Sequence, residues 1–159
     1  MRAALGKHRP ASGRKRAKRA PFPRGNVSKS SDRSFRIRVF VVEDHPMTAQ
    51  ALKTFLGLRN YQVEIAATLH SAVALAPKIE FDVLVCDLTL PDGSGWELPA
   101  KLGERARSRA IAYSALDEPH HLLQSRQAGF AEHLVKGCDP DELVAAIERV
   151  FQGKGRFPK

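Results

Sequence analysis

The chain has 159 residues and a formal net charge of +9, and that charge is unevenly distributed. Residues 1–34 carry eleven Lys or Arg residues and one acid, whereas residues 35–159 carry fifteen basic and sixteen acidic residues. The length suits one domain of about 120 residues with some excess, and no apolar run reaches the ~18 residues of a membrane span. We therefore expect a cytoplasmic protein with no membrane partner. The two cysteines, Cys86 and Cys138, have neither metal-site spacing nor the number that a disulfide framework needs.

Residues 1–34 are rich in Pro, Gly, Ser and basic side chains and show no apolar period. Such a segment buries too little surface to offset its ordering entropy, so we expect a disordered basic arm. Its basic run at residues 14–19 could bind nucleic acid by counterion release. The favoured reading is a passive tail or an over-extended start of the gene, and a transit peptide is a further alternative. Loss of a salt-sensitive nucleic-acid affinity on deletion of residues 1–34 would favour the binding role.

The folded part opens with a β-branched and aromatic strand pattern at residues 37–42. Pro46 suits the first turn of a helix, and a second strand is predicted over residues 61–67. Thr68 is predicted to cap the next helix. Residues 81–86 are almost entirely apolar, as in a strand covered on both faces. The first helix has apolar residues at helical spacing: Met47, Ala51, Leu52, Phe55 and Leu56.

A turn-rich loop is predicted over residues 88–95, with a short helix from about Trp96. Residues 110–114 form the fourth predicted strand. The next helix is predicted over residues 119–128, with Gly129 as its C-cap.

The fifth strand is predicted over residues 132–135, and Asp139 caps the last helix. Five strands alternating with five helices indicate an α/β fold, a doubly wound five-stranded parallel sheet. The expected organisation is a basic arm (residues 1–34), one domain (35–153) and a short tail (154–159). The apolar stripe of the last helix comprises Leu143, Ala146, Ile147, Val150 and Phe151.

Polar residues stand at the predicted carboxyl ends of four strands, where ligands bind in parallel α/β sheets. Glu43 and Asp44 follow the first strand, Asp87 the third, Ser114 the fourth and Lys136 the fifth. Clustered carboxylates repel one another unless a cation joins them, and a hard divalent cation such as Mg²⁺ suits oxygen ligands. A carboxylate can also accept a phosphoryl group as an acyl phosphate. Asp87 is the best candidate acceptor because the acid pair and Ser114/Lys136 flank it.

The blocks VFVVEDHP, VLVCDLTLPDGSG, IAYSA and HLVKG resemble those of response-regulator receiver domains of the CheY-like superfamily. The resemblance covers residues 36–153 and implies a flavodoxin-like strand order of 2-1-3-4-5. It implies that Asp87 is the phosphorylated aspartate and that Mg²⁺ is held by Glu43, Asp44, Asp87 and the Thr89 carbonyl. The phosphoryl-contacting and switch positions it implies are Ser114, Ala115, Lys136 and His133.

The chain departs from the family pattern at three of these places. In the family, a proline in a cis peptide usually follows the lysine, and Gly137 stands at that place here. A non-proline cis bond costs about 3 kcal/mol. The sequence alone leaves both the cis and the trans form of the Lys136–Gly137 bond open. His133 replaces the usual Tyr or Phe of the switch. Thr89 is smaller than the side chains often found there, which bears on the lifetime of the acyl phosphate.

The sequence thus predicts a stand-alone response regulator rather than an enzyme. It would take a phosphoryl group on Asp87 from a histidine kinase or a histidine phosphotransfer protein and signal to an unidentified protein by contact. The alternatives are a receiver that regulates nucleic-acid binding by the arm, and a degenerate receiver that is not phosphorylated. A phosphoester hydrolase is disfavoured because Thr89 stands where a second aspartate would act as acid and base.

Several conspicuous residues are expected to have ordinary structural roles. Cys86 is expected in the core, and Trp96 is expected to anchor packing. The Gly93-x-Gly95 pair follows the wrong strand for a dinucleotide site and favours a tight turn. Adjacent His120 and His121 are expected to be solvated, because neighbours in sequence do not share a helix face.

Overall fold

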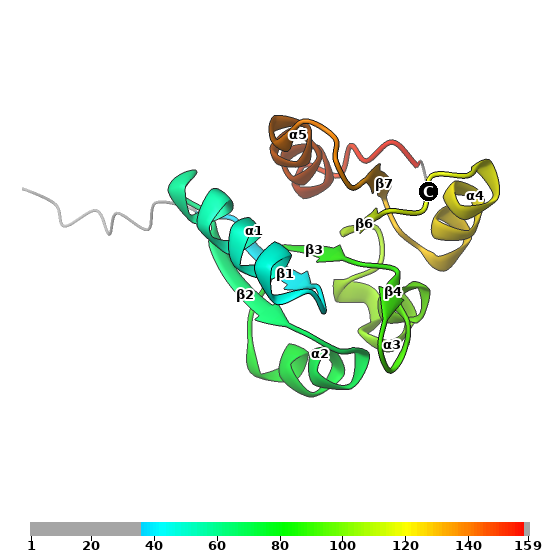
Figure 1. Cartoon of the computed structure of the whole chain (residues 1–159), viewed down its shortest axis with the longest axis horizontal. Helices are drawn as coiled ribbons and strands as arrows, with labels where there is room; N and C mark the ends of the chain where they lie inside the picture. Colours follow the sequence, from blue (N-terminus) through cyan, green and yellow to red (C-terminus); the bar gives the residue numbers. More distant parts are fainter. Residues whose placement is uncertain (1–35, 158–159) are drawn as a thin grey trace, which may run out of the picture. The chain divides into compact units, whose positions relative to one another are not determined.

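The computed structural model describes residues 36–157, in which the central element is a five-stranded parallel sheet (Figure 1). Its strand order is β2-β1-β3-β6-β7, which confirms the predicted order of 2-1-3-4-5. The predictions for residues 1–34, including the nucleic-acid alternative, lie outside the described residues. The strands are β1 (Arg38–Val42), β2 (Gln62–Ala66), β3 (Val83–Cys86), β6 (Ala110–Ser114) and β7 (Glu132–Val135).

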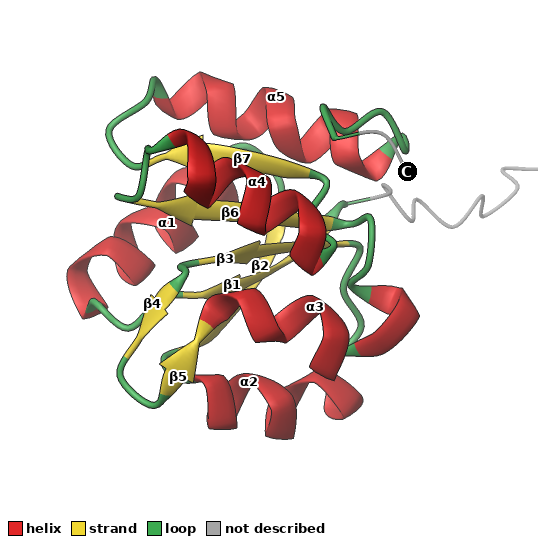
Figure 2. Cartoon of the chain, turned by 90° about the vertical axis from the view of Figure 1, so that its right-hand side faces the viewer, coloured by secondary structure: helices red, strands yellow, loops and turns green. Residues whose placement is uncertain are grey.

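Five helices cover the two faces of this sheet (Figure 2). Their apolar residues form one core cluster with α1 and α5 and a second with α2, α3 and the end of α4. All four residues of β3 are buried because both clusters cover this central strand. The helices are α1 (Pro46–Leu58), α2 (Leu69–Leu75), α3 (Leu98–Lys101), α4 (Pro119–Ala128) and α5 (Pro140–Phe151). Within the described part of the chain, no helix is both long and apolar enough to cross a bilayer.

The predicted caps are confirmed. The Thr68 hydroxyl accepts from the Ser71 amide, and Ser71 reciprocates to the Thr68 amide in a capping box. The Asp139 carboxylate accepts from the Asp141 amide at 2.9 Å at the start of α5. Gly129 ends α4 with φ +97°, a left-handed conformation that favours glycine.

The structure corrects three expectations about local structure. The predicted loop 88–95 contains a two-residue antiparallel pair, β4 (Thr89–Leu90) with β5 (Gly93–Ser94), too short to leave a periodic pattern. Met47 and Ala51 are expected on the apolar stripe of α1, but both are exposed, Met47 by 75%. The buried residues of α1 are Ala49, Leu52 and Leu56. The stripe of α5 is buried from Leu143 to Val150, whereas Phe151 is 39% exposed.

Gly95 is required where the turn after β5 passes the acidic residue Asp87. An ideal Cβ on Gly95 would lie 2.0 Å from the Asp87 carbonyl oxygen and 2.8 Å from the Leu88 Cα, and neither backbone atom can move away alone. This close approach, rather than a dinucleotide site, accounts for the glycine.

Replacing Gly95 with alanine is expected to lower the free energy of unfolding by about 1–3 kcal/mol, the usual cost of overpacking. Gly57→Ala is the matched control, because Gly57 lies in α1 with open space around its Cα, and it is expected to stabilise by about 0.5–1 kcal/mol. Urea unfolding of both variants measures the difference. Equal stabilities of the two variants would contradict the close approach at Gly95.

Candidate functional site

Three acidic side chains meet at the carboxyl ends of the two central strands. Glu43 and Asp44 follow β1 and Asp87 follows β3, and one carboxylate oxygen from each lies within 4.8 Å of the others. Glu43 is 2% exposed and Asp87 8% exposed, whereas Asp44 faces solvent. The structure therefore brings together the three carboxylates that the sequence singled out.

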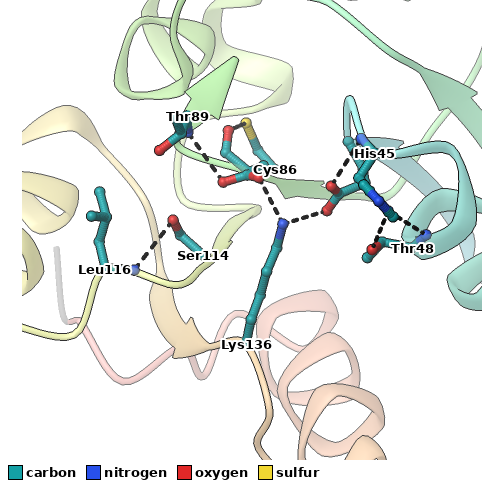
Figure 3. A network of polar contacts seen from close by, with 9 residues as sticks. His45, Thr48, Cys86, Thr89, Ser114, Leu116 and Lys136 are labelled. Atoms are coloured by element: carbon teal, nitrogen blue, oxygen red, sulfur yellow. Dashed lines mark hydrogen bonds and ion pairs between the residues drawn. The ribbon is translucent and has the colours of Figure 1, made fainter. Parts of the chain in front are cut away.

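Lys136 enters this cluster from the end of β7 and lies between two of the acids (Figure 3). Its Nζ is 2.7 Å from Glu43 Oε2 and 2.6 Å from Asp87 Oδ2. Burial opposes the charge of the ammonium, but the hydrogen bonds to Asp87 and Glu43 outweigh that cost and raise the pKa of Lys136. The lysine is thus a fixed positive charge against the Asp87 carboxylate.

Backbone amides hold the second oxygen of each buried acid. Glu43 Oε1 accepts from the His45 amide at 3.2 Å, and Asp87 Oδ1 accepts from the Thr89 amide at 3.1 Å. These bonds orient both carboxylates before any ligand arrives. Thr89, whose carbonyl was predicted as a metal ligand, therefore lies beside Asp87 in β4.

The donor set fits a divalent cation. Three carboxylates and one ammonium leave two formal negative charges, and all the free donors are hard oxygen atoms, which Mg²⁺ prefers. An exposed Asp44 also leaves one side of the cluster open to water and to an incoming phosphate group.

Ser114 lies across from the acids, at the end of β6 (Figure 3), and Ala115 follows it in the chain. Ser114 is 1% exposed, and its carbonyl accepts from the Lys136 amide at 2.8 Å, which ties the end of β6 to the end of β7. The Ser114 hydroxyl accepts from the Leu116 amide at 3.5 Å, a long bond that leaves it weakly held. Ala115 is exposed at the start of the loop to α4.

His133 lies in β7, but its ring contacts none of the acids. Its Nδ1 is 2.9 Å from the Ser125 hydroxyl of α4, and its Nε2 is 2.8 Å from the Leu116 carbonyl. Burial lowers the pKa of the imidazole. Ser125 is fully buried and also accepts from Trp96 Nε1 at 3.0 Å. No sequence signal distinguished Ser125, because its two side-chain partners, Trp96 and His133, come from two other segments of the chain.

The peptide bond between Lys136 and Gly137 is trans, as are the other peptide bonds of the described residues. Gly137 has φ +95°, in the left-handed region that glycine occupies without strain. The glycine that replaces the usual proline therefore shapes the turn from Lys136 toward Asp139 by its backbone freedom.

The structure also tests the expectations for Cys86 and for the adjacent histidines. Cys86 is fully buried as predicted, and burial first of all raises the pKa of its thiol. His121 is not solvated as predicted: its ring stacks on Trp96 with centroids 5.9 Å apart, and its Nδ1 is buried without a hydrogen-bond partner in the described structure. The His120 ring lies 3.9 Å from that of His121, so the adjacent histidines do meet.

Known proteins are similar to this chain in sequence. The chain is 33% identical over 120 residues to the transcriptional regulatory protein UhpA of Salmonella typhimurium and 32% identical over 109 residues to KdpE of Mycobacterium tuberculosis. The alignments cover 74% and 69% of this chain but 60% and 48% of those proteins. The chain thus spans about half to three fifths of the length of these curated relatives.

Solved structures show the same fold. A CheY-like receiver domain protein from Methanospirillum hungatei superposes with a TM-score of 0.68 at 24% identity, covering 75% of this chain and 96% of the other. CheY4 of Vibrio cholerae superposes with a TM-score of 0.63 at 25% identity, covering 72% and 98%. The family model "response regulator receiver domain" matches residues 39–148. The chain therefore belongs to the response-regulator receiver domain family of two-component signalling.

Proposed function

We propose that this domain accepts a phosphoryl group on Asp87 from a phosphohistidine of a histidine kinase or a histidine phosphotransfer protein. The observation that carries the proposal is the position of Lys136 Nζ, 2.6 Å from Asp87 Oδ2 inside a cluster of three carboxylates. A structural acid needs no such arrangement, whereas an acceptor carboxylate needs a fixed cation beside it to bear the charge that arrives with the phosphoryl group.

In the transfer, one Asp87 carboxylate oxygen forms a bond to phosphorus while the nitrogen–phosphorus bond of the donor histidine breaks. The electron pair of that bond stays on the donor imidazole, and the product is an acyl phosphate on Asp87. Lys136 neutralises part of the added charge, and the weakly held hydroxyl of Ser114 is free to donate to a phosphoryl oxygen. Ala115, directly after Ser114, would offer its backbone amide to the same group.

Glu43, Asp44, Asp87 and the Thr89 carbonyl would hold Mg²⁺, which supplies charge neutralisation and in-line positioning of the phosphoryl group. The domain changes its own covalent state in this reaction, so we propose a phosphoacceptor rather than a turnover enzyme. His133 would take the switch position and respond to the loop after Ser114.

We propose that a protein donor binds a groove that includes Met47, three residues after the acid Asp44. An exposed apolar groove of about 520 Å³ runs between α1 and α5, and it includes the 75% exposed side chain of Met47. Apolar side chains beside a charged reaction centre suit transient contact with a helical partner. The lining residues are Met47, Thr48, Ala51, Leu52, Phe55, Tyr113, Pro140 and Leu143.

We propose that output from the described domain is by protein contact. The relatives UhpA and KdpE are transcriptional regulators, but the shared region covers only 60% and 48% of their lengths. Transcriptional regulation is therefore a property of those whole proteins and is not assigned to this domain. The stand-alone mode, the cytoplasmic location and the nucleic-acid alternative for residues 1–34 remain predictions from the sequence.

The test is incubation of the full chain with acetyl phosphate and Mg²⁺, followed by intact-mass measurement. We expect one added phosphoryl group that is labile to base, does not form when Mg²⁺ is chelated before the donor is added, and is absent in Asp87→Asn, because an amide cannot form an acyl phosphate. Asp117→Asn, an exposed aspartate in the loop after β6, is the matched control and should label like the wild type. Equal labelling of Asp87→Asn would refute the proposal.

A further inference from the structure

The short hairpin of β4 and β5 lies beside the start of α2 (Figure 2). Asp92 forms the tip of this hairpin, and its Oδ1 accepts from the Leu69 amide at 2.7 Å while its Oδ2 accepts from the His70 amide at 2.8 Å. Gly93 packs closely on α2, because an ideal Cβ on Gly93 would lie 2.7 Å from Leu69 Cδ2. The hairpin is therefore joined to α2 by both polar and apolar contacts.

Asp92 adds a second acceptor to a helix that already has a local cap. The Thr68 side chain accepts from the Ser71 amide, whereas Asp92 takes the first two amides of α2 from another segment of the chain. These amides have no partner within the helix, and bonds to a carboxylate are stronger than bonds to a neutral acceptor. The His70 amide above all, and the Leu69 amide with it, lower the pKa of the Asp92 carboxyl. Because water could also bond to these exposed amides, the specific effect of Asp92 is to hold the hairpin.

The same hairpin carries a residue of the candidate metal site. Thr89 of β4 donates its amide to Asp87 Oδ1 at 3.1 Å, and its carbonyl is the backbone oxygen that we propose as a Mg²⁺ ligand. Leu90 is 7% exposed and packs in the core, so it holds the hairpin on the side of the sheet. Only two residues separate Thr89 from Asp92, so a displacement of the hairpin tip would reach the backbone at Thr89.

The contact at Asp92 closes a ring of backbone segments around the acids. The Glu43 amide, at the end of β1, donates to the Ala66 carbonyl at the end of β2 at 3.0 Å, and α2 begins three residues later. On the other side, the Asp87 amide donates to the Val42 carbonyl at 2.8 Å, which ties β3 back to β1. Mg²⁺ demands nearly ideal octahedral geometry with ligands at about 2.0–2.1 Å. Ligands from opposite sides of this ring must therefore keep their spacing.

We propose that Asp92 is a positioning residue that holds the β4–β5 hairpin against α2 and thereby fixes the Thr89 carbonyl at the spacing that Mg²⁺ requires. This inference rests on the proposed function, because it concerns the metal site beside the acceptor Asp87. Both oxygens of Asp92 are bonded to α2, so the residue acts through the backbone of the hairpin and not as a ligand. Its removal should weaken metal binding while every ligand is still present.

The first test measures metal affinity in the full chain with no phosphoryl donor present. Mn²⁺ prefers the same oxygen ligands as Mg²⁺, and electron paramagnetic resonance of the free ion gives its Kd. We expect Asp92→Ala to raise this Kd about threefold to tenfold, the effect of losing hydrogen bonds. Asp92→Asn removes the same charge but keeps one acceptor oxygen, so its Kd should lie between the two. A wild-type Kd in Asp92→Ala, or equal Kd values in the two variants, would overturn the proposal.

Thr68→Ala is the matched control, because it weakens the start of the same helix without touching the hairpin. We expect its Kd for Mn²⁺ to match that of the wild type. A rise in Thr68→Ala equal to that in Asp92→Ala would mean that loosening of α2, rather than the loss of the hairpin contact, weakens the site. That result would refute the positioning role.

The second test is the Mg²⁺ dependence of labelling by acetyl phosphate. Asp92→Ala should need about threefold to tenfold more Mg²⁺ to reach half of its maximal rate, in proportion to the loss of affinity. Its rate at saturating Mg²⁺ should equal that of the wild type, because Asp92 does not touch the phosphoryl group. An unchanged Mg²⁺ requirement with a lower saturating rate would contradict the proposal. If Asp87 is not an acceptor, labelling fails at position 87 in the wild type too, whereas the Mn²⁺ affinities still decide the role of Asp92.

Discussion

Replacing Lys136 with methionine is expected to slow the labelling of Asp87 by acetyl phosphate about a hundredfold, the usual effect of removing one fixed electrostatic contact in a reaction site. The Lys136 ammonium is 2.6 Å from Asp87 and 2.7 Å from Glu43, and methionine keeps most of its length without the charge. Glu43 is 2% exposed, so it would lose its cation with no water to replace it. Time courses of intact mass measure the rate.

Lys136→Arg keeps a positive charge and should label at a rate between those of the wild type and Lys136→Met, because the guanidinium fork does not reproduce a point charge between two carboxylates. Lys101→Met removes an exposed lysine that pairs with Glu97 at 3.3 Å and should leave the rate unchanged. Wild-type labelling of Lys136→Met would show that the ammonium has no part in the transfer.

Replacing Arg149 with methionine is expected to lower the free energy of unfolding by about 3 kcal/mol, because a buried carboxylate would lose its partner. Glu132 of β7 is fully buried, and its two oxygens accept from Arg149 Nε at 2.9 Å and Nη2 at 2.8 Å. Arg156 lies 4.0 Å from Glu132 and keeps some positive charge near it. The expected loss in the free energy of unfolding is therefore at the lower end of the range for broken buried ion pairs. Urea unfolding measures the change.

The matched control replaces both partners. Glu132→Leu combined with Arg149→Met removes the buried charge together with its counter-ion and should lie within about 1 kcal/mol of the wild type. Arg59→Met breaks an exposed pair with Asp141 at 2.7 Å and should cost less than about 1 kcal/mol. A double variant as unstable as Arg149→Met would mean that packing, rather than the unpaired carboxylate, causes the loss.

The strands of the sheet and the helix caps follow from the sequence because they depend on local patterns, whereas the strand order follows from the resemblance to receiver domains. The apolar run of β3, Thr68 before α2 and Gly129 after α4 each carry one physical signal, and the structure confirms all three. The meeting of Glu43 and Asp87 was also predictable, because parallel strands present their carboxyl ends at one edge of the sheet.

The features that escaped prediction depend on side chains from distant segments. Trp96 is expected to anchor packing and His133 to take the switch position, but no pattern in the sequence links either residue to Ser125, because the three meet only after their elements pack. His121 seemed solvated from its position beside His120, but Trp96 covers it from another segment. In the sequence, the Gly93-x-Gly95 pair could be compared with a tight turn or with a dinucleotide site. The close approach of Gly95 to the Asp87 carbonyl explains the glycine without a dinucleotide site.

The central claim is that Asp87 is the acceptor, and reductive mapping tests it most directly. After incubation with acetyl phosphate and Mg²⁺, borohydride converts an aspartyl phosphate to homoserine, and peptide sequencing by mass spectrometry locates the new residue. The buried cluster of Glu43, Asp87 and Lys136 predicts homoserine at position 87 in the wild type and nowhere in Asp87→Asn. Homoserine at another aspartate, or none in a labelled wild-type protein, would contradict this assignment.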